Sequence, residues 1–416
     1  MKISAARGFT IIEVLVGAAV ALLVIGIVMG TFLTQQRSLQ AMDLSREASN
    51  GARDAMFSLQ QSIGRAGYGV DPTVAFDFQY YNCAAVPCRD SITAPDEMVF
   101  VERDPNYYWA GSPTSIVQGC TTDTSAPCSG HAWPITEFTD STHIKINATA
   151  GDTFLLGQVV LMTCPKGSQP TMGTVGATAK ASSTGSLAIT LVTPVAGNPY
   201  KTNVVSGAAT CFGAVYGVSG AAAGVSLFLV NRYRYFLTTV SGDPWLMLDR
   251  GLDYNQNGTT PENGADPADY IPIARGAEDM QIAYLLRPPP SPWTGSGAAP
   301  TAPDLPTGTG DWIFGNVAGT AEEPNPADTA PTQSTLDNDP LRYNRNPANI
   351  RGVRVRLSIR SLQRDQTVPN FAGDSYPASI ENRNDFTAIT LGGFRRYQNS
   401  ISVATPNMNS KDPFIF

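Results

Sequence analysis

The chain is poor in the side chains on which most metalloenzymes and nucleic-acid-binding proteins depend. Only two of its 416 residues are histidine, which argues against a histidine-rich metal enzyme. Charged residues make up 15% of the chain, below the roughly 25% of an average soluble protein. The 35 acidic and 28 basic side chains leave a net charge of −7. Because the chain is acidic and has no basic cluster, we expect no nucleic acid among its partners.

Sequence patterns typical of catalysis are missing as well. The chain has no GxSxG nucleophile elbow, no HExxH zinc motif, no P-loop and no dinucleotide-binding glycine pattern. His131 and His143 have polar or threonine neighbours, and we interpret both as surface or half-buried side chains. We therefore expect no enzymatic activity and no organic cofactor.

The sequence does contain one long apolar run near its start. From Phe9 to Leu33 the only ionisable side chain is Glu13. At about 1.5 Å per residue, a helix over this run would span roughly 37 Å, enough for the ~30 Å hydrocarbon core of a bilayer. Lys2 and Arg7 precede the run, which predicts a single-pass orientation with the amino terminus in the cytoplasm.

The order of leader and apolar run differs from that of a secretory signal peptide. In a secretory signal the apolar region precedes a small-residue cleavage site and is lost on cleavage. Here the small residue, Gly8, precedes the apolar run. A cut after Gly8 would leave the membrane segment on the mature protein.

The segment Arg7-Gly8-Phe9-Thr10-Ile11-Ile12-Glu13 resembles the leader and cleavage site of the type IV pilin superfamily. The resemblance implies that a prepilin peptidase removes leader residues 1–8 by cutting between Gly8 and Phe9, and methylates the new amino group of Phe9. Glu13 matches the acidic residue that the family keeps in this stretch. A carboxylate in hydrocarbon costs about 3 kcal/mol on insertion scales and therefore needs a partner. The Phe9 ammonium, on the same chain or on a neighbouring subunit, would fix the axial register of assembly.

Beyond Leu33 the hydrophobic pattern becomes amphipathic without a break. Apolar residues recur mostly at three- and four-residue steps, between charged ones. No proline occurs before Pro72, and glycines at 64, 67 and 69 supply stop signals. We predict one helix from about Phe9 to Arg65, roughly 85 Å long. Its half at 9–33 would cross the membrane, and its amphipathic half at 34–67 would pack on a sheet.

The remainder, 68–416, is interpreted as a periplasmic or extracellular β-rich domain, which gives an α+β fold with an antiparallel sheet. Short β segments alternate with glycine, proline, asparagine and serine. The expected strands are 97–102, 142–147, 154–164, 186–192, 226–239, 279–286 and 351–360. Two insertions interrupt them. One at 80–128 carries aromatic residues and four cysteines, and one at 287–349 is rich in proline and is either a partner-binding element or an inert insertion.

Several patches of this domain resemble PilW-type minor pilins. They are Gly64 to Gly69, Arg275 to Tyr284, Val353 to Ser361 and Arg395-Arg396-Tyr397, and Gly151-Asp152 with the strand that ends at Cys164 is a further shared segment. In the second patch we assign Ala277, Met280 and Ile282 to the core and Glu278 and Asp279 to a turn or cap. In the third, alternation places the arginines on a solvated face of the sheet.

This resemblance implies a low-copy subunit that primes or caps a type IV pilus. The implied partners are other minor pilins and the major pilin, contacted through the helix, together with a large tip adhesin or assembly protein. The protein would sit in the inner membrane before assembly and in the pilus at the cell surface afterwards. Two alternatives stay open: a J-type minor pseudopilin of type II secretion, and a membrane-anchored surface adhesin or periplasmic enzyme.

All six cysteines lie in the domain beyond the membrane segment. They are Cys83, Cys88, Cys120, Cys128, Cys164 and Cys211. An even number of cysteines in a non-cytosolic domain favours disulfides, for which 15 pairings are possible. Proximity in sequence suggests Cys83–Cys88, Cys120–Cys128 and Cys164–Cys211.

One loop resembles the start of a calcium-binding pattern. Asp253, Asn255, Asn257 and Gly258 match its opening, but Gly264 stands where the bidentate glutamate is expected. Other oxygen ligands would then have to come from Asp249, Glu262, Asp266 or Asp269. An Asn-Gly turn of a β-hairpin explains the same residues without a metal.

Overall fold

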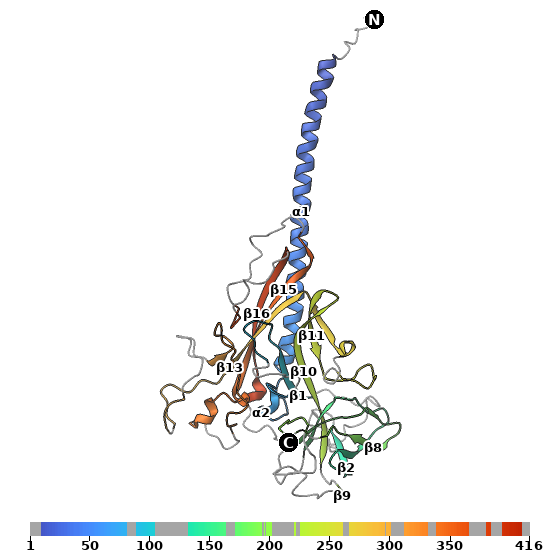
Figure 1. Ribbon diagram of the computed structural model, residues 1–416, viewed down its shortest axis with the longest axis vertical. Helices are drawn as coiled ribbons and strands as arrows, with labels where there is room; N and C mark the ends of the chain where they lie inside the picture. The colour runs from blue at the N-terminus through green and yellow to red at the C-terminus, as the bar shows by residue number, and fades with distance from the viewer. Residues whose placement is uncertain are drawn as a thin grey trace, which may run out of the picture.

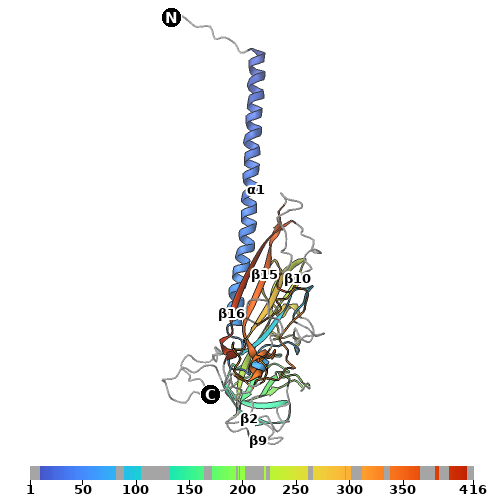
Figure 2. The same cartoon turned by 90° about the vertical axis from the view of Figure 1, so that its left-hand side faces the viewer.

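The computed structural model consists of one long helix and a β-rich body at the carboxyl end of that helix (Figures 1 and 2). It describes residues 10–80, 89–104, 132–163, 171–193, 195, 197–201, 220–221, 225–260, 266–295, 297–300, 312–331, 338–365, 380–383 and 393–409. The predicted α+β fold class is confirmed, because the helix packs on largely antiparallel sheets.

Helix α1 (Ile11–Ile63) runs without interruption for 53 residues, close to the predicted bounds. Its amino-terminal half projects beyond the body, and its other half lies along strands β15 and β16 (Figure 2). The chain leaves the helix through glycines with positive φ, 78° at Gly67 and 64° at Gly69. A Cβ on Gly69 would lie 2.9 Å from the Arg103 side chain, so this turn favours glycine on both grounds.

The sheet that carries the helix has the order β14 (Trp312–Phe314), β13 (Ala277–Leu286), β15 (Ile350–Arg364), β16 (Phe394–Ala404), with antiparallel neighbours throughout. The helix buries small and apolar side chains against the body, namely Leu44, Ala48, Ala52, Ala55, Met56, Leu59 and Ile63. The apolar face predicted for β15 is confirmed, since Val353, Val355, Leu357 and Ile359 are all buried. On the other face the alternation fails at Ser358, which is buried as well.

The patch around β13 confirms one part of its prediction and corrects another. Ala277, Met280 and Ile282 are buried, as expected of core residues. Glu278 and Asp279 were expected in a turn or cap, but both lie within β13. They are accommodated there by ion pairs, Glu278 with Arg396 at 2.6 Å and Asp279 with Arg383 at 2.5 Å.

A second, ten-stranded sheet contacts the carboxyl-terminal part of α1 and continues beyond it. Its main path is β12 (Ile271–Arg275), β11 (Asp243–Asp249), β10 (Ser226–Val240), β2 (Trp133–Phe138), β3 (His143–Ala148) and β8 (Gly185–Thr190). Off this path are β1 (Met98–Arg103), β5 (Val159–Thr163), β6 (Thr171–Thr174) and β9 (Gly220–Ala221). Strands β4 (Thr153–Phe154) and β7 (Ala179–Lys180) form a small sheet of their own.

The short helices share a start signal. They are α2 (Pro72–Ala75) and the 3₁₀ turns Pro267–Asp269, Pro340–Tyr343, Pro347–Asn349 and Pro406–Asn409. In the first four, an aspartate or asparagine directly before the proline accepts a hydrogen bond from the amide two residues further on. Proline at the first helical position leaves no unsatisfied amide there, so the Asx-Pro pair fixes the turn locally.

Most of the described residues between 132 and 201 form a distal lobe at the end of the body away from the helix amino terminus (Figure 1). The distal lobe has its own hydrophobic core, separate from the core that contains α1. At its centre Trp133 is fully buried, donates from Nε1 to Asp152 Oδ2 at 2.7 Å, and packs edge-on against Phe154.

Strands β5 and β10 form a wall between the two cores. Val160 and Met162 of β5 point into the distal core, together with Leu227 and Leu229 of β10. Their alternate neighbours Val159, Leu161, Phe228 and Val230 point into the core that contains α1. The second half of β10 continues past this wall and pairs with β1 and β11.

Described parts of both predicted insertions belong to the body. Strand β1 lies within 80–128 and pairs with β10 over six residues. Within 287–349, β14 pairs with β13, and Trp293 packs edge-on against Tyr343 at 5.6 Å between ring centroids. The proline-rich segment is thus partly folded onto the sheet.

Two buried carboxylates of the first insertion bind other segments of the body, Asp90 the second insertion and Asp96 strand β13. Asp90 Oδ1 accepts from Asn382 Nδ2 at 2.5 Å, and Asp90 Oδ2 accepts from the amide of Glu322. Asp96 Oδ2 accepts from the amide of Ile282 at 2.8 Å. Burial raises the pKa of Asp90 to about 6, and burial together with the neighbouring Asp90 raises the pKa of Asp96.

This pair predicts that the protein loses stability as the pH rises from about 4 to 7. The pKa of Asp90 in the folded protein exceeds its ordinary value of 3.8. The stabilisation contributed by protonated Asp90 is therefore complete below pH 3.8 and is lost as the pH rises past about 6. The change should be on the order of 1–3 kcal/mol. Urea unfolding at several pH values would measure it. Asp90→Asn imitates the neutral acid and should flatten the dependence. An equal slope in the variant would contradict the assignment.

Candidate functional site: the N-terminal helix

The first half of α1 exposes an apolar surface that no other described part of the chain covers. Its side chains from Ile11 to Leu33 are all solvent-exposed, Ile11 for 82% of its surface and Phe32 for 52%. The helix is long and apolar enough to cross a membrane. This arrangement fits a membrane anchor followed by a soluble carboxyl-terminal body.

Glu13 takes part in a hydrogen-bonded cap at the start of the helix. Its backbone amide donates to Thr10 Oγ1 at 3.3 Å, and its Oε2 accepts from the backbone amide of Thr10 at 2.9 Å. This reciprocal pair is a capping box, and its Thr-x-x-Glu spacing is a recognisable signature in the sequence. Gly8 and Phe9, the predicted cleavage and methylation positions, lie outside the described residues.

The capping box leaves Glu13 able to bind a further cation. Both bonds from Thr10 end on Oε2, so Oε1 is available to another donor. Since the box uses only Thr10 and Glu13, it would persist after a cut between Gly8 and Phe9. Helix capping and pairing with an ammonium group are therefore compatible roles for one carboxylate.

The second half of α1 has a partly apolar outer face. Leu39, Met42 and Phe57 are each more than half exposed, while the opposite side of the helix is buried against the body. An open groove of about 750 Å³ lies where the helix leaves the sheet, lined by Gln36, Leu39, Gln40, Asp43, Leu44, Glu47 and Gln363.

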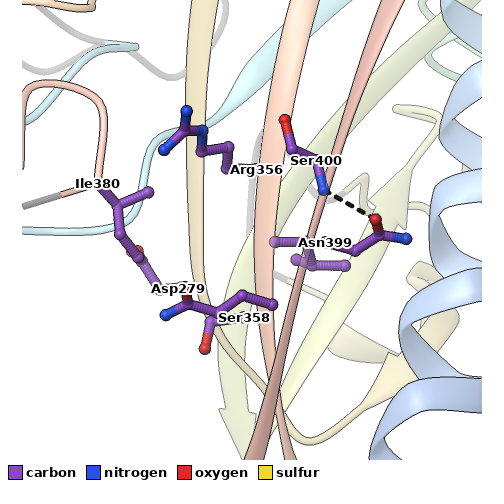
Figure 3. A pocket seen from close by; sticks show the side chains of 8 residues that line it. Asp279, Arg356, Ser358, Ile380, Asn399 and Ser400 are labelled. Atoms are coloured by element: carbon purple, nitrogen blue, oxygen red, sulfur yellow. Dashed lines mark hydrogen bonds between the residues drawn. The ribbon is translucent and has the colours of Figure 1, made fainter. Parts of the chain in front are cut away.

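A smaller pocket on strands β15 and β16 has little capacity for a ligand (Figure 3). Its volume is about 140 Å³, below the roughly 300–1,000 Å³ of typical small-molecule sites. Arg356 at its rim forms an ion pair with Glu381 at 2.8 Å, and Arg354 pairs with the same carboxylate at 2.6 Å. These arginines of the predicted solvated row are thus partly exposed and charge-compensated.

The two histidines and the six cysteines considered in the sequence add no described residue to a candidate site. His143 forms an exposed pair with Asp140, with Nδ1 2.8 Å from Oδ2, and His131 lies outside the described residues. All six cysteines also lie outside them, so the three proposed disulfides stay predictions.

Of the predicted calcium residues, Asp253, Asn255, Asn257, Gly258, Asp266 and Asp269 lie between β11 and β12, and Asp249 is the last residue of β11. Glu262 and Gly264 lie outside the described residues. The amides of Asn257 and Gly258 donate to Asp253, and the side-chain amides of Asn255 and Asn257 donate to Asp266. Burial raises the pKa of nearby Asp269, and the carboxylates of Asp266 and Asp253 act in the same direction. Within the described part of the chain, no three His, Cys, Asp or Glu side chains could hold a metal by themselves.

Comparison with known proteins identifies no relative. No protein-family model matches the chain, and neither a curated protein nor a solved structure matches it.

Proposed function

We propose that this chain is a PilW-type minor pilin. Its helix would pack among the helices of other pilins, and it would prime or cap a type IV pilus in a low-copy tip complex. Before assembly it would reside in the inner membrane with its body in the periplasm. The observation that carries the proposal is the division of α1 into an exposed apolar half and a half packed on an antiparallel sheet.

Two environments are open to the exposed half of α1. A helix that is apolar all round is stable either in lipid or inside a bundle of similar helices. Moving between them costs little, because the same surface is covered in both. Glu13 would fix the axial register of the helix, because its carboxylate is stabilised in an apolar bundle only where it lies beside a positive charge.

The shape of the body supports a low copy number. The second sheet and the distal lobe extend from the helix-bearing sheet (Figure 1). Such a body is hard to repeat on every subunit of a thin filament, but is readily accommodated at its end.

Processing provides the first test of the proposal. Mass spectrometry of the protein from cells with an active prepilin peptidase should show a chain that begins at Phe9 and carries a methyl group. The same protein from peptidase-deficient cells is the control and should retain Met1. An unprocessed amino terminus in both strains would contradict the proposal.

The choice between pilus and type II secretion requires a separate experiment. Deletion of the gene should remove surface pili and leave exoprotein secretion intact, and the reintroduced gene should restore the pili. Loss of secretion with normal piliation would favour the J-type pseudopilin instead.

A further inference from the structure

The end of β15 and the start of β16 form the edge of the body that lies nearest the exposed half of α1 (Figures 1 and 2). We call residues 360–365 and 393–396 the proximal edge. A Cβ on Gly51 would lie 3.8 Å from the Ile359 side chain of β15. Further along β15, Gln363 lines the open groove beside earlier turns of α1. Strand β15 therefore runs toward the apolar half of the helix as it approaches the proximal edge.

The proximal edge lies close to the height at which α1 would leave a bilayer. The apolar run of α1 ends at Leu33, and the groove that contains Gln363 begins at Gln36. At about 1.5 Å per residue, Gln40 in the middle of the groove lies only about 10 Å beyond Leu33. The headgroup region adds roughly 5–8 Å to each side of the hydrocarbon core, and membrane helices are tilted by about 20° on average. Long side chains of the proximal edge are therefore within reach of lipid headgroups.

The proximal edge and the adjoining turns of α1 are basic, although the whole chain has a net charge of −7. Residues 34–47, 360–365 and 393–396 contain six arginines and three carboxylates, and Glu278 of the neighbouring β13 adds a fourth carboxylate. The arginines are Arg37, Arg46, Arg360, Arg364, Arg395 and Arg396. A local excess of positive charge on an acidic protein favours an anionic partner at this edge.

Within the proximal edge, Arg364 is the arginine available to such a partner. It is exposed and forms no ion pair with any residue that the structure describes. Its guanidinium lies 5.4 Å from the centre of the Phe394 ring, which Arg360 also approaches, at 4.0 Å. Stacking on the ring orients the guanidinium of Arg364 and leaves its N–H groups for an acceptor outside the described chain. The other arginines of the edge are paired with carboxylates, Arg360 and Arg396 with Glu278 and Arg395 with Asp365.

We propose that the proximal edge binds the headgroups of anionic phospholipids, with Arg364 as its main contact. A guanidinium matches the geometry of a phosphate group, to which it can donate two parallel hydrogen bonds. Lipid is the partner favoured by position, because α1 would enter the bilayer beside this edge and no further partner has to be recruited. The contact would restrict the swing of the body about the helix. This inference rests on α1 spanning the bilayer and is independent of the proposed role in a pilus.

Hydrogen exchange of the full chain in lipid nanodiscs tests the proposal. In phosphatidylglycerol, the amides of the proximal edge should exchange about fivefold more slowly than in phosphatidylcholine, the effect expected of one arginine near an anionic surface. Amides of the distal lobe should exchange equally in the two lipids. Raising the salt concentration from about 0.1 M to about 1 M should remove the difference, because the Debye length falls from about 10 Å to about 3 Å. Equal exchange of the proximal edge in the two lipids would overturn the proposal.

Free phosphate distinguishes a lipid-binding edge from a site for a small anion. Inorganic phosphate added to the full chain in a neutral detergent should leave exchange at the proximal edge unchanged. If phosphate alone slows this exchange as much as phosphatidylglycerol does, the assignment to lipid is wrong.

Substitutions assign the effect to Arg364. Arg364→Glu should remove the difference between the two lipids, and Arg364→Lys, which keeps the charge, should retain it. Lys180→Glu makes the same change of charge at an exposed position of β7 in the distal lobe and is the control. A full lipid-dependent difference in Arg364→Glu, or its loss in Lys180→Glu, would contradict the role of Arg364. Because the comparison of lipids uses the wild-type chain, misfolding of Arg364→Glu would not leave the question open.

Discussion

Replacing Glu13 by glutamine should nearly abolish incorporation into pili while leaving α1 intact. Glutamine accepts hydrogen bonds, so the capping box with Thr10 is retained, but the negative charge is lost. If the charge pairs with an ammonium group in the apolar bundle, a loss of about 1.4 kcal/mol or more lowers incorporation about tenfold or more. Immunoblots of sheared pili against whole cells would measure the ratio.

The control for this prediction is the reciprocal change. Thr10→Ala removes the threonine hydroxyl that accepts from the Glu13 amide and keeps the Glu13 carboxylate. It should leave incorporation close to that of the wild type, with slight fraying of the first helical turn. Glu13→Ala removes both charge and cap and should resemble Glu13→Gln. Should Glu13→Gln assemble normally and Thr10→Ala fail, Glu13 acts through the helix cap and the register role is wrong.

Trp133→Ala should unfold the distal lobe without releasing the helix from its sheet. Trp133 is fully buried, and its indole N–H is bonded to Asp152. Truncation of a buried tryptophan to alanine costs about 3–5 kcal/mol. Because the distal core is separate from the core that contains α1, exchange should accelerate in residues 132–201 and change little in β15 and β16. Hydrogen exchange with mass spectrometry would resolve the two regions.

Trp245→Ala provides a matched control. Trp245 lies in β11 and is only half-buried, so the same change of side chain should cost less. It should not alter exchange in the core of the distal lobe. Uniform acceleration throughout the chain in Trp133→Ala would indicate that the two cores unfold together.

Most of the helix and several strands were predictable because their burial pattern is local. The apolar steps of α1, the absence of proline before Pro72 and the glycines after Ile63 specify the helix from its own sequence. The sequence of β15 likewise alternates between apolar and polar residues from Val353 to Arg360. Strand β11 was not predicted from the sequence. In the structure it follows a turn at Ser241-Gly242, where both residues have positive φ, a conformation typical of hairpins.

The two-core organisation could not be predicted in the same way. Strands β5 and β10 are buried on both faces where they form the wall, so their sequences are continuous apolar runs. Such a run does not reveal which segments cover each face. Those partners come from distant parts of the chain.

The candidate residues likewise divide into those that the local sequence predicts and those that only the folded structure brings together. The Thr10–Glu13 box was readable from spacing alone. Asp269 was one of several candidate ligands in the sequence, but only the short turn begun by Asp266-Pro267 presents its carboxyl group to the loop.

The wall formed by β5 and β10 has a mechanical consequence. Strand β10 is one continuous strand of 15 residues that pairs with β5 at one end and with β1 and β11 at the other. Tension applied at the far tip of the molecule would thus travel along a single covalent backbone toward the helix. Where that pull runs parallel to the strands, it would load their hydrogen bonds in shear, many at once, instead of unzipping them one at a time.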